Sequence, residues 1–323
     1  MSIFSLVQSA NMMESRTIAV PEGVDGGTEI PVTTIRGKGP GPVLALIAGN
    51  HGYEYPPILA LERLRSCLAP ERLAGTAVLV HVANMPSFLG RTVYFSPVDG
   101  KNLNRCYPGA PDGTVSERIA YAITTEVIEQ CDYLLDLHCG DGNEALRPYV
   151  YQTVTGNAAM DAGIKRLALA FGIDHIVVDR NRPTDPARSI YCSSTAITRG
   201  KPAMTIESGG LGGTDEPSVE RIVSGVFGVM RELGMLANGP APLQRPVYLD
   251  PVEVLSSPAT GILYPRVKPD QHVERDTLLA HITDFFGNPA GEVRAPFDGV
   301  VLYVVATPPI TKGQPVACIG HPR

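Results

Sequence analysis

Short apolar runs alternate with longer segments of helical periodicity over the first two-thirds of the chain. The apolar runs predict buried strands at residues 43–48, 76–82, 133–137, 175–178 and 201–206. The helical patterns cover residues 57–68, 114–130, 157–171 and 217–233, and Thr114 with Glu117 forms a capping box at the start of the second. This alternation predicts an α/β domain over residues 1–238, with its strands in one sheet.

The pattern changes after residue 238. A Pro-rich stretch, residues 238–246, has linker composition, and only short strands and turns follow it. Residues 258–282 are echoed by residues 296–319 with nearly the same spacing, which predicts a β domain over residues 239–323 with a two-fold repeat. The repeat resembles the barrel-sandwich fold of biotinyl and lipoyl domains. Those carriers present a lysine between the two halves, but residues 283–294 contain none, so we expect a structural or lid role.

Composition narrows the class of protein. Hydrophobic residues make up 44% of the 323 residues, enough for a packed core, and no apolar stretch approaches the roughly 18 residues of a membrane span. The formal charge is -6 with scattered basic residues, so neither nucleic acid nor an anionic membrane is an expected partner. The six cysteines form no C-x-x-C pair, and the first twenty residues do not resemble a signal peptide. We therefore expect free thiols and a cytoplasmic protein.

Titratable residues follow three of the predicted strands. His51, His138 and Glu207 each come just after an apolar run, and the carboxyl ends of parallel strands meet at one edge of a sheet. Glu54 lies three residues after His51 and can join it on one ion. Two imidazoles and one carboxylate would hold zinc with an open position, leaving Glu207 as general base. Asp141 is an alternative ligand, and ordinary polar residues at strand ends are the simpler interpretation.

A polar loop supplies a candidate for substrate binding. Residues 99–109 are dense in hydrogen-bonding side chains, and the Arg105 guanidinium can fork onto a carboxylate with Asn104 beside it. A solvated arginine and a turn-stabilising asparagine are the alternative. The chain contains no G-x-S-x-G, P-loop or G-x-G-x-x-G motif, which disfavours serine hydrolases, P-loop NTPases and dinucleotide enzymes.

Four motifs in order resemble the succinylglutamate desuccinylase/aspartoacylase family: residues 49–54, 102–109, 136–138 and 205–210. The resemblance implies a zinc-carboxypeptidase-like fold, a mixed sheet flanked by helices, and a C-terminal β domain. It implies one zinc ion per chain on His51, Glu54 and His138, with Glu207 as the catalytic glutamate. Asn104 and Arg105 fall where the family grips the substrate carboxylate, and Arg91 is aligned with its carbonyl-polarising arginine.

The function that follows from this resemblance is a zinc-dependent amide hydrolase that removes an acyl group from a small N-acyl amino acid. Tyr53 and Cys139 depart from the family pattern, so the acyl group and the amino acid stay open. The resemblance is nearest to prokaryotic deacylase-like members. Two other functions remain: a metallocarboxypeptidase acting on short peptides, and a noncatalytic binding or scaffold protein with a vestigial zinc site. The sequence leaves the choice between a monomer and a homo-oligomer open.

Overall fold

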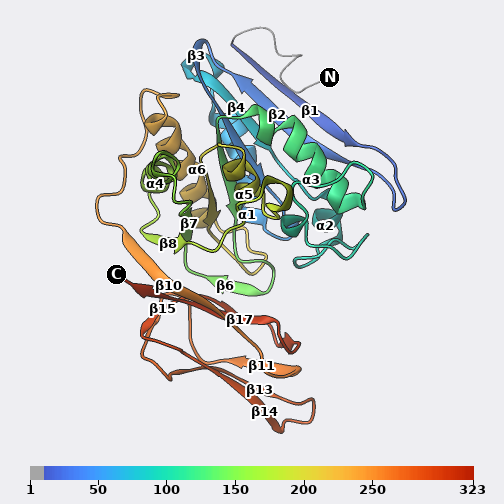
Figure 1. Ribbon diagram of the computed structural model, residues 1–323, viewed down its shortest axis with the longest axis vertical. Coiled ribbons are helices and arrows are strands. Elements are labelled where there is room, and N and C mark those ends of the chain that lie inside the picture. Colours follow the sequence, from blue (N-terminus) through green and yellow to red (C-terminus); the bar gives the residue numbers. More distant parts are fainter. Residues whose placement is uncertain (1–10) are drawn as a thin grey trace.

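The computed structural model describes residues 11–323 (Figure 1). The first ten residues lie outside the described part. They include half of the twenty residues on which the signal-peptide prediction rests, and the start of the predicted first domain. The helices are α1 (Tyr55–Cys67), α2 (Met85–Gly90), α3 (Val115–Glu126), α4 (Ala158–Phe171), α5 (Cys192–Thr198) and α6 (Glu216–Glu232), with short 3-10 helices η1 (Pro70–Arg72), η2 (Leu103–Arg105), η3 (Ile128–Gln130) and η4 (Pro186–Arg188).

The strands up to residue 207 are β1 (Met12–Val20), β2 (Thr28–Arg36), β3 (Gly39–Ala48), β4 (Ala74–Val80), β5 (Tyr133–His138), β6 (Glu144–Leu146), β7 (Tyr149–Thr153), β8 (His175–Asp179) and β9 (Ala203–Glu207). The later strands are β10 (Val247–Ser256), β11 (Gly261–Pro265), β12 (His272–Val273), β13 (Leu278–Thr283), β14 (Pro289–Arg294), β15 (Gly299–Val305), β16 (Pro309–Ile310) and β17 (Pro315–Pro322).

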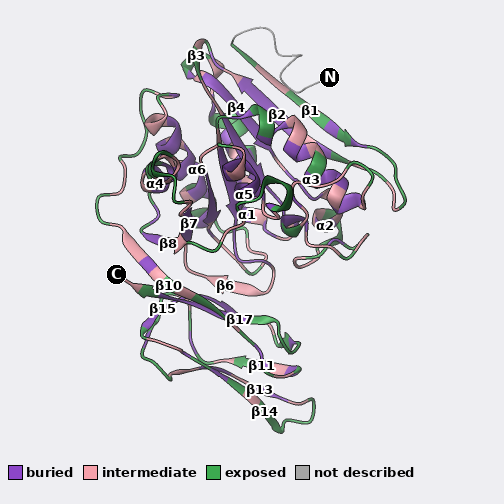
Figure 2. Cartoon of the chain, viewed as in Figure 1, coloured by how far each residue is buried: buried purple, intermediate pink, exposed green. Residues whose placement is uncertain are grey.

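A mixed sheet of thirteen strands runs through the molecule in the order β1-β2-β4-β3-β5-β9-β7-β8-β10-β17-β15-β12, with β6 paired to β15. Strands β4, β3, β5 and β9 are parallel neighbours, and the second half of β3, residues 44–48, and nearly all of β5 are buried. This explains their continuous apolar sequences, because a strand covered on both faces has no solvent-facing side chains. In Figure 2 much of the central sheet is coloured as buried.

Helices and strands of the first part share one large apolar core. Helices α1, α6 and α4 pack in a row, and α5 packs against β5 and β9. The core extends from Ile18 to Met235 and is separate from a second core formed by residues 263–319. A third apolar cluster, which includes Tyr149, Leu249 and Val300, joins the two parts. The predicted domain boundary at residues 238–239 falls in the irregular stretch between α6 and β10.

Each copy of the C-terminal repeat contributes one antiparallel pair of strands. Strands β11 and β13 pair antiparallel in the first copy, and β15 and β17 pair antiparallel in the second. The short strands are exchanged: β12 of the first copy pairs with β15, and β16 of the second copy pairs with β11. The repeated glycines mark close approaches, since a Cβ on Gly261 would lie 1.9 Å from the carbonyl oxygen of Thr283.

The fold class is confirmed, and the boundaries of the predicted elements differ mainly at their ends. The predicted helix over residues 114–130 is α3 followed by η3, and its capping box is present. The segment between the predicted strand ending at residue 82 and the predicted helix starting at residue 114 contains α2 and η2. Sequence analysis missed the β1–β2 hairpin, β7, α5 and β10. No helix within residues 11–323 combines the length and apolar character needed to cross a membrane.

Candidate metal centre and pocket

Three strand ends bring the candidate site together. In the sheet β5 lies between β3 and β9, and its last residue, His138, is in register with Glu207 at the end of β9. The turn after β3 carries His51 and leads to Glu54 at the N-cap of α1. Gly49 begins this turn with a φ of 72°, a left-handed conformation that glycine adopts without a Cβ clash. The predicted meeting of His51, His138 and Glu207 at one sheet edge is therefore what the structure contains.

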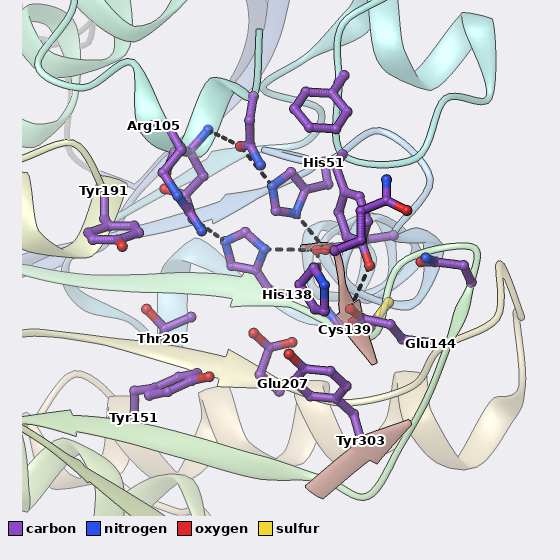
Figure 3. A pocket seen from close by; sticks show the side chains of 18 of the residues that line it. His51, Arg105, His138, Cys139, Glu144, Tyr151, Tyr191, Thr205, Glu207 and Tyr303 are labelled. Carbon is purple, nitrogen blue, oxygen red and sulfur yellow. Dashed lines mark hydrogen bonds and ion pairs between the residues drawn. The ribbon is translucent and has the colours of Figure 1, made fainter. Parts of the chain in front are cut away.

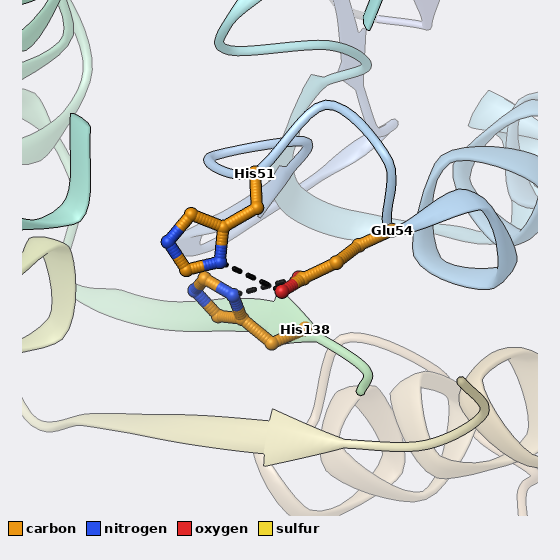
Figure 4. A group of neighbouring side chains, drawn as sticks. All are labelled: His51, Glu54 and His138. Atoms are coloured by element: carbon orange, nitrogen blue, oxygen red, sulfur yellow. Dashed lines mark hydrogen bonds and ion pairs between the residues drawn. The ribbon is translucent and has the colours of Figure 1, made fainter. Parts of the chain in front are cut away.

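Glu54 joins the two histidines (Figure 4). Its Oε1 lies 2.7 Å from Nδ1 of His51, and its Oε2 lies 2.8 Å from Nδ1 of His138. The three side chains offer ligand atoms within 4.8 Å of one another, and Glu54 and His138 are each only 2% exposed. Glu54 makes no side-chain capping bond to its own helix, so both carboxylate oxygens point to the histidines.

The second nitrogen of each imidazole is held by an acceptor. His51 Nε2 lies 3.0 Å from Oδ1 of Asn102, and His138 Nε2 lies 3.0 Å from Oδ1 of Asp136. Because these oxygens only accept, each Nε2 carries the proton and each Nδ1 presents a lone pair when a cation is bound. Burial opposes a charge on His138, yet Asp136 and Glu54 raise its pKa well above the usual value. A cluster that stabilises positive charge in this way fits a divalent cation, and His₂Glu is a zinc donor set.

Asp141, the alternative ligand, lies outside this group. Its Oδ2 accepts a hydrogen bond from the backbone N–H of Tyr94 at 2.9 Å, and its Oδ1 accepts one from Gly142 at 2.6 Å. Burial, reinforced by the negative charge of Glu54, raises the pKa of Asp141 to about 6. Both oxygens therefore serve to hold the surrounding loops together, and the donor set of the described chain is His51, Glu54 and His138.

Glu207 lines the pocket beside the group formed by His51, Glu54 and His138 (Figure 3). The pocket has a volume of about 440 Å³, within the usual size of a small-molecule site. Glu207 accepts no hydrogen bond from residues 11–323 that would hold its carboxylate away from the pocket. Burial raises its pKa well above the usual value, with the neighbouring Glu54 and Glu144 acting in the same direction. A carboxylate with a raised proton affinity next to a candidate metal site is suited to accept a proton as a general base.

Arg105 and Asn104 also line this pocket, and they play different parts in it. The Arg105 side chain donates from Nη1 to the carbonyl oxygen of Asn104 at 2.7 Å and lies 4.5 Å from the ring centre of Tyr191. It has no acidic partner within residues 11–323, so its charge is available to a substrate. Asn104 is 7% exposed and accepts a hydrogen bond from the backbone N–H of Cys192 at 2.8 Å. Its amide therefore positions the loop beside His138.

Arg91 is not brought to the pocket. It occupies the C-cap of α2 with a left-handed φ of 52°, its side chain is exposed, and it is absent from the residues that line the pocket. In this arrangement the Arg91 side chain lies outside the lining of the pocket that contains Glu207. The catalytic role given to Arg91 by resemblance stays a prediction without geometric support.

A comparison with family models decides the family. Residues 40–233 match the model of the succinylglutamate desuccinylase/aspartoacylase catalytic domain. The chain belongs to this family. The matched range includes His51, Glu54, His138 and Glu207, and the membership inferred from the four motifs is confirmed.

Individual members of the family are similar over nearly the whole chain. A protein from Halomonas elongata named N-alpha-acetyl-L-2,4-diaminobutyric acid deacetylase is 32% identical over 313 residues, covering 94% of this chain and 89% of its own. The product-bound ectoine utilization protein EutE (DoeB) from Ruegeria pomeroyi superimposes with a TM-score of 0.85 at 26% identity, covering 97% and 96% of the two chains. A family member from Rhodobacter sphaeroides gives a TM-score of 0.84 at 26% identity and covers 96% and 95%.

Sequence analysis missed several residues of the pocket. Arg182 packs between Tyr151 and Tyr191, with its guanidinium 5.2 and 4.3 Å from their ring centres, and it pairs with Asp179. The other side of the pocket contains Tyr94, Asn143, Glu144 and Tyr303. Arg182 lies in an aperiodic loop before Pro183, and Tyr303 lies in the C-terminal part. Only the aromatic residues of the strand over residues 149–153 gave a local signal, and that strand was not predicted.

Proposed function

We propose that this protein is a zinc-dependent deacylase that hydrolyses the amide bond of a small N-acyl amino acid. The observation that carries the proposal is the His51–Glu54–His138 group with Glu207 beside it in one pocket. The same pocket contains Arg105, which has no acidic partner within residues 11–323. Family membership supports amide hydrolysis, and the Halomonas relative, named as a deacetylase of an N-acetyl amino acid, supports the substrate class.

His51, Glu54 and His138 would hold the zinc ion. Bound there, zinc supplies a Lewis acid for the amide carbonyl and makes a neighbouring water more acidic. Asn102 and Asp136 fix the two imidazoles through their Nε2 atoms, so the ring orientation does not depend on the substrate.

Glu207 is the proposed proton carrier. Its carboxylate takes a proton from the attacking water and returns it to the nitrogen of the leaving amine, which restores the carboxylate. Arg105 binds the substrate carboxylate and is held in place by stacking on Tyr191. The buried surroundings of Glu207 keep bulk water from competing for the proton.

All six cysteines, Cys67, Cys106, Cys131, Cys139, Cys192 and Cys318, are free thiols. This supports the further proposal that the protein works in a reducing compartment such as the cytoplasm.

A substrate panel tests the proposal against a peptidase. We expect zinc-loaded protein to hydrolyse Nα-acetyl-L-2,4-diaminobutyrate or another N-acetyl amino acid with a higher kcat/KM than any dipeptide or tripeptide. Activity should disappear on treatment with a chelator and return with zinc. The Glu207→Gln variant serves as the control for a contaminating hydrolase. Higher kcat/KM values for peptides, or chelator-resistant deacylation, would contradict the proposal.

A further inference from the structure

The pocket has charges of opposite sign on its two sides. In Figure 3, Arg105 and Tyr191 lie on one side of His138 and Glu207, and Glu144 lies on the other. Arg105 has no acidic partner and Glu144 no basic partner within residues 11–323. Arg105 and Glu144 both lose hydration when a ligand fills the pocket. A ligand with a negative charge at one end and a positive charge at the other compensates for this loss at both residues.

Glu144 is fixed in the wall of the pocket. Its Oε1 accepts a hydrogen bond from the hydroxyl of Tyr94 at 2.5 Å. Its Oε2 accepts none from the described chain. Its backbone is held by β15, where Glu144 is in register with Val305. The carboxylate is therefore positioned by the C-terminal part of the chain with one oxygen still able to accept.

A second acceptor lies next to this carboxylate. Asn143 also lines the pocket, and its side-chain Oδ1 is buried without a hydrogen-bond partner. The Asn143 backbone carbonyl accepts a hydrogen bond from Ala306 at 2.9 Å, so the C-terminal part holds this residue too. A buried acceptor without a donor destabilises the protein, and a ligand with N–H groups can remove this cost by donating a hydrogen bond.

The electrostatic surroundings favour a cation at this place. Burial raises the pKa of Glu144 to about 7. The negative charges of Glu54 and Asp141 also raise this pKa, whereas the hydrogen bond from Tyr94 lowers it. A positive group bound to Glu144 would restore its ionised form. An ammonium group supplies both the charge and up to three N–H donors, which matches one carboxylate oxygen and one amide oxygen.

We propose that Glu144 and Asn143, with Tyr94 orienting the carboxylate, form a specificity subsite for an ammonium group of the substrate. This inference rests on the proposed deacylase function and deepens it, because it selects N-acyl amino acids that carry a positive charge besides the carboxylate bound by Arg105. The ammonium can belong to the amino-acid side chain or to the acyl group, and both present the same chemistry to Glu144. An anionic acyl group such as succinyl would meet the carboxylate of Glu144 and be disfavoured.

Binding of products tests the subsite without catalysis. By calorimetry with zinc-loaded protein, we expect L-2,4-diaminobutyrate to bind about tenfold or more tightly than L-2-aminobutyrate, since the two differ by one ammonium group and charge-assisted hydrogen bonds are strong. Glu144→Gln keeps an acceptor for Tyr94 but removes the charge, and it should reduce this ratio toward one. Glu292→Gln, at an exposed carboxylate of β14, is the matched control and should keep the ratio.

Kinetics distinguish the source of the ammonium. A preference for Nα-acetyl-2,4-diaminobutyrate over Nα-acetyl-2-aminobutyrate assigns it to the side chain, and a preference for N-(4-aminobutanoyl)- over N-butanoyl-2-aminobutyrate, neither of which is an α-peptide, assigns it to the acyl group. Either preference should fall at least tenfold in Glu144→Gln. Equal binding of both products, together with equal hydrolysis of charged and neutral substrates, would overturn the subsite while leaving the deacylase proposal intact. Ammonium-selective binding without hydrolysis of any substrate would refute the proposed function instead.

Discussion

Glu54 holds His51 and His138 in the arrangement in which they can bind one metal ion. It occupies the N-cap of α1, where a carboxylate commonly accepts from the helix backbone, but both of its oxygens are engaged by Nδ1 atoms of His51 and His138. Burial opposes the ionised carboxylate, yet the two histidines lower the pKa of Glu54 to about 2. The charge needed to hold a divalent cation is therefore already present in the folded protein.

Replacing Glu207 by glutamine separates proton transfer from metal binding. Glutamine has nearly the same shape but cannot accept the proton of water, so kcat should fall by about 10²- to 10⁴-fold, the usual contribution of general acid–base catalysis. Zinc content should stay at the wild-type level, because Glu207 is not one of the three candidate ligands. Steady-state kinetics beside elemental mass spectrometry measure both. A variant with undiminished kcat would remove Glu207 from the mechanism.

The two arginines predicted from the family pattern should behave differently. Arg105→Ala removes a charge from the pocket and should raise KM about 10- to 100-fold, the range for a lost charge-assisted contact. Arg91→Ala alters an exposed side chain and should change kcat/KM by no more than about twofold. Kinetics of the two variants under the same conditions provide the comparison. A large loss of kcat in Arg91→Ala would restore the carbonyl-polarising role predicted for it.

Site residues could be predicted from the sequence where they directly follow a strand that is recognisable as an apolar run. His51, His138 and Glu207 follow apolar runs directly, and parallel strands end at one edge, so their meeting followed from pattern and topology. Glu144 is different, since its place depends on β15, some 160 residues later in the chain. Arg182 belongs to a loop without periodicity. No local pattern encodes such long-range placement.

At the scale of elements, a hydrogen-bond chain links the end of β4 to the outer strands. His81 Nε2 lies 2.8 Å from Oγ1 of Thr33 in β2, which lies 2.8 Å from Oγ of Ser15 in β1. Burial, with Arg65 nearby, lowers the pKa of His81 to about 4. We therefore expect the stability of the β1–β2 hairpin to depend on the protonation of His81.

The free energy of unfolding should therefore decline between pH 6.5 and pH 4. Unfolded His81 takes up a proton near pH 6.5, whereas folded His81 resists protonation until about pH 4, so acid favours the unfolded chain in this interval. Urea unfolding at pH 7 and pH 5 should show a smaller decline in His81→Gln than in the wild type. Equal declines in both proteins would show that His81 is protonated alike in the folded and unfolded chain.

The strands that were predicted and those that were missed differ in where their stability comes from. Residues 43–48 and 133–137 are apolar without interruption, so their burial is visible locally. Strand β10 follows a Pro-rich stretch and alternates only weakly; it exists because it pairs with both β8 and β17. The two copies of the repeat span the residues that form β11, β13, β15 and most of β17, whereas the exchange of β12 and β16 between the copies could not be predicted from the sequence.

At the scale of the whole molecule, the two parts are joined rather than tethered. Strand β10 continues the large sheet from β8 to β17, and the third apolar cluster lies between the two main cores. We expect one cooperative thermal transition, with calorimetric and van't Hoff enthalpies in agreement. Differential scanning calorimetry measures this directly. Two resolved transitions would indicate that residues 239–323 unfold independently of the part that holds the metal group.

The joining of the two parts also completes the pocket. Its walls include Tyr303, Ile310 and Gln314 from the C-terminal part, facing His138 and Glu207 from the sheet edge. The C-terminal part therefore forms one wall of the pocket, and the substrate selection proposed at Glu144 depends on it. A structural or lid role for the β domain stays a prediction.

The metal content of protein purified without added metal tests the central claim most directly. Elemental mass spectrometry should find about one zinc ion per chain, as a single His₂Glu site requires, and His51→Ala should lose it. The variant must keep the wild-type circular dichroism spectrum, so that metal loss is not a consequence of unfolding. Wild-type protein that holds no zinc, even after incubation with the metal, would contradict the account of this site as a zinc-dependent deacylase.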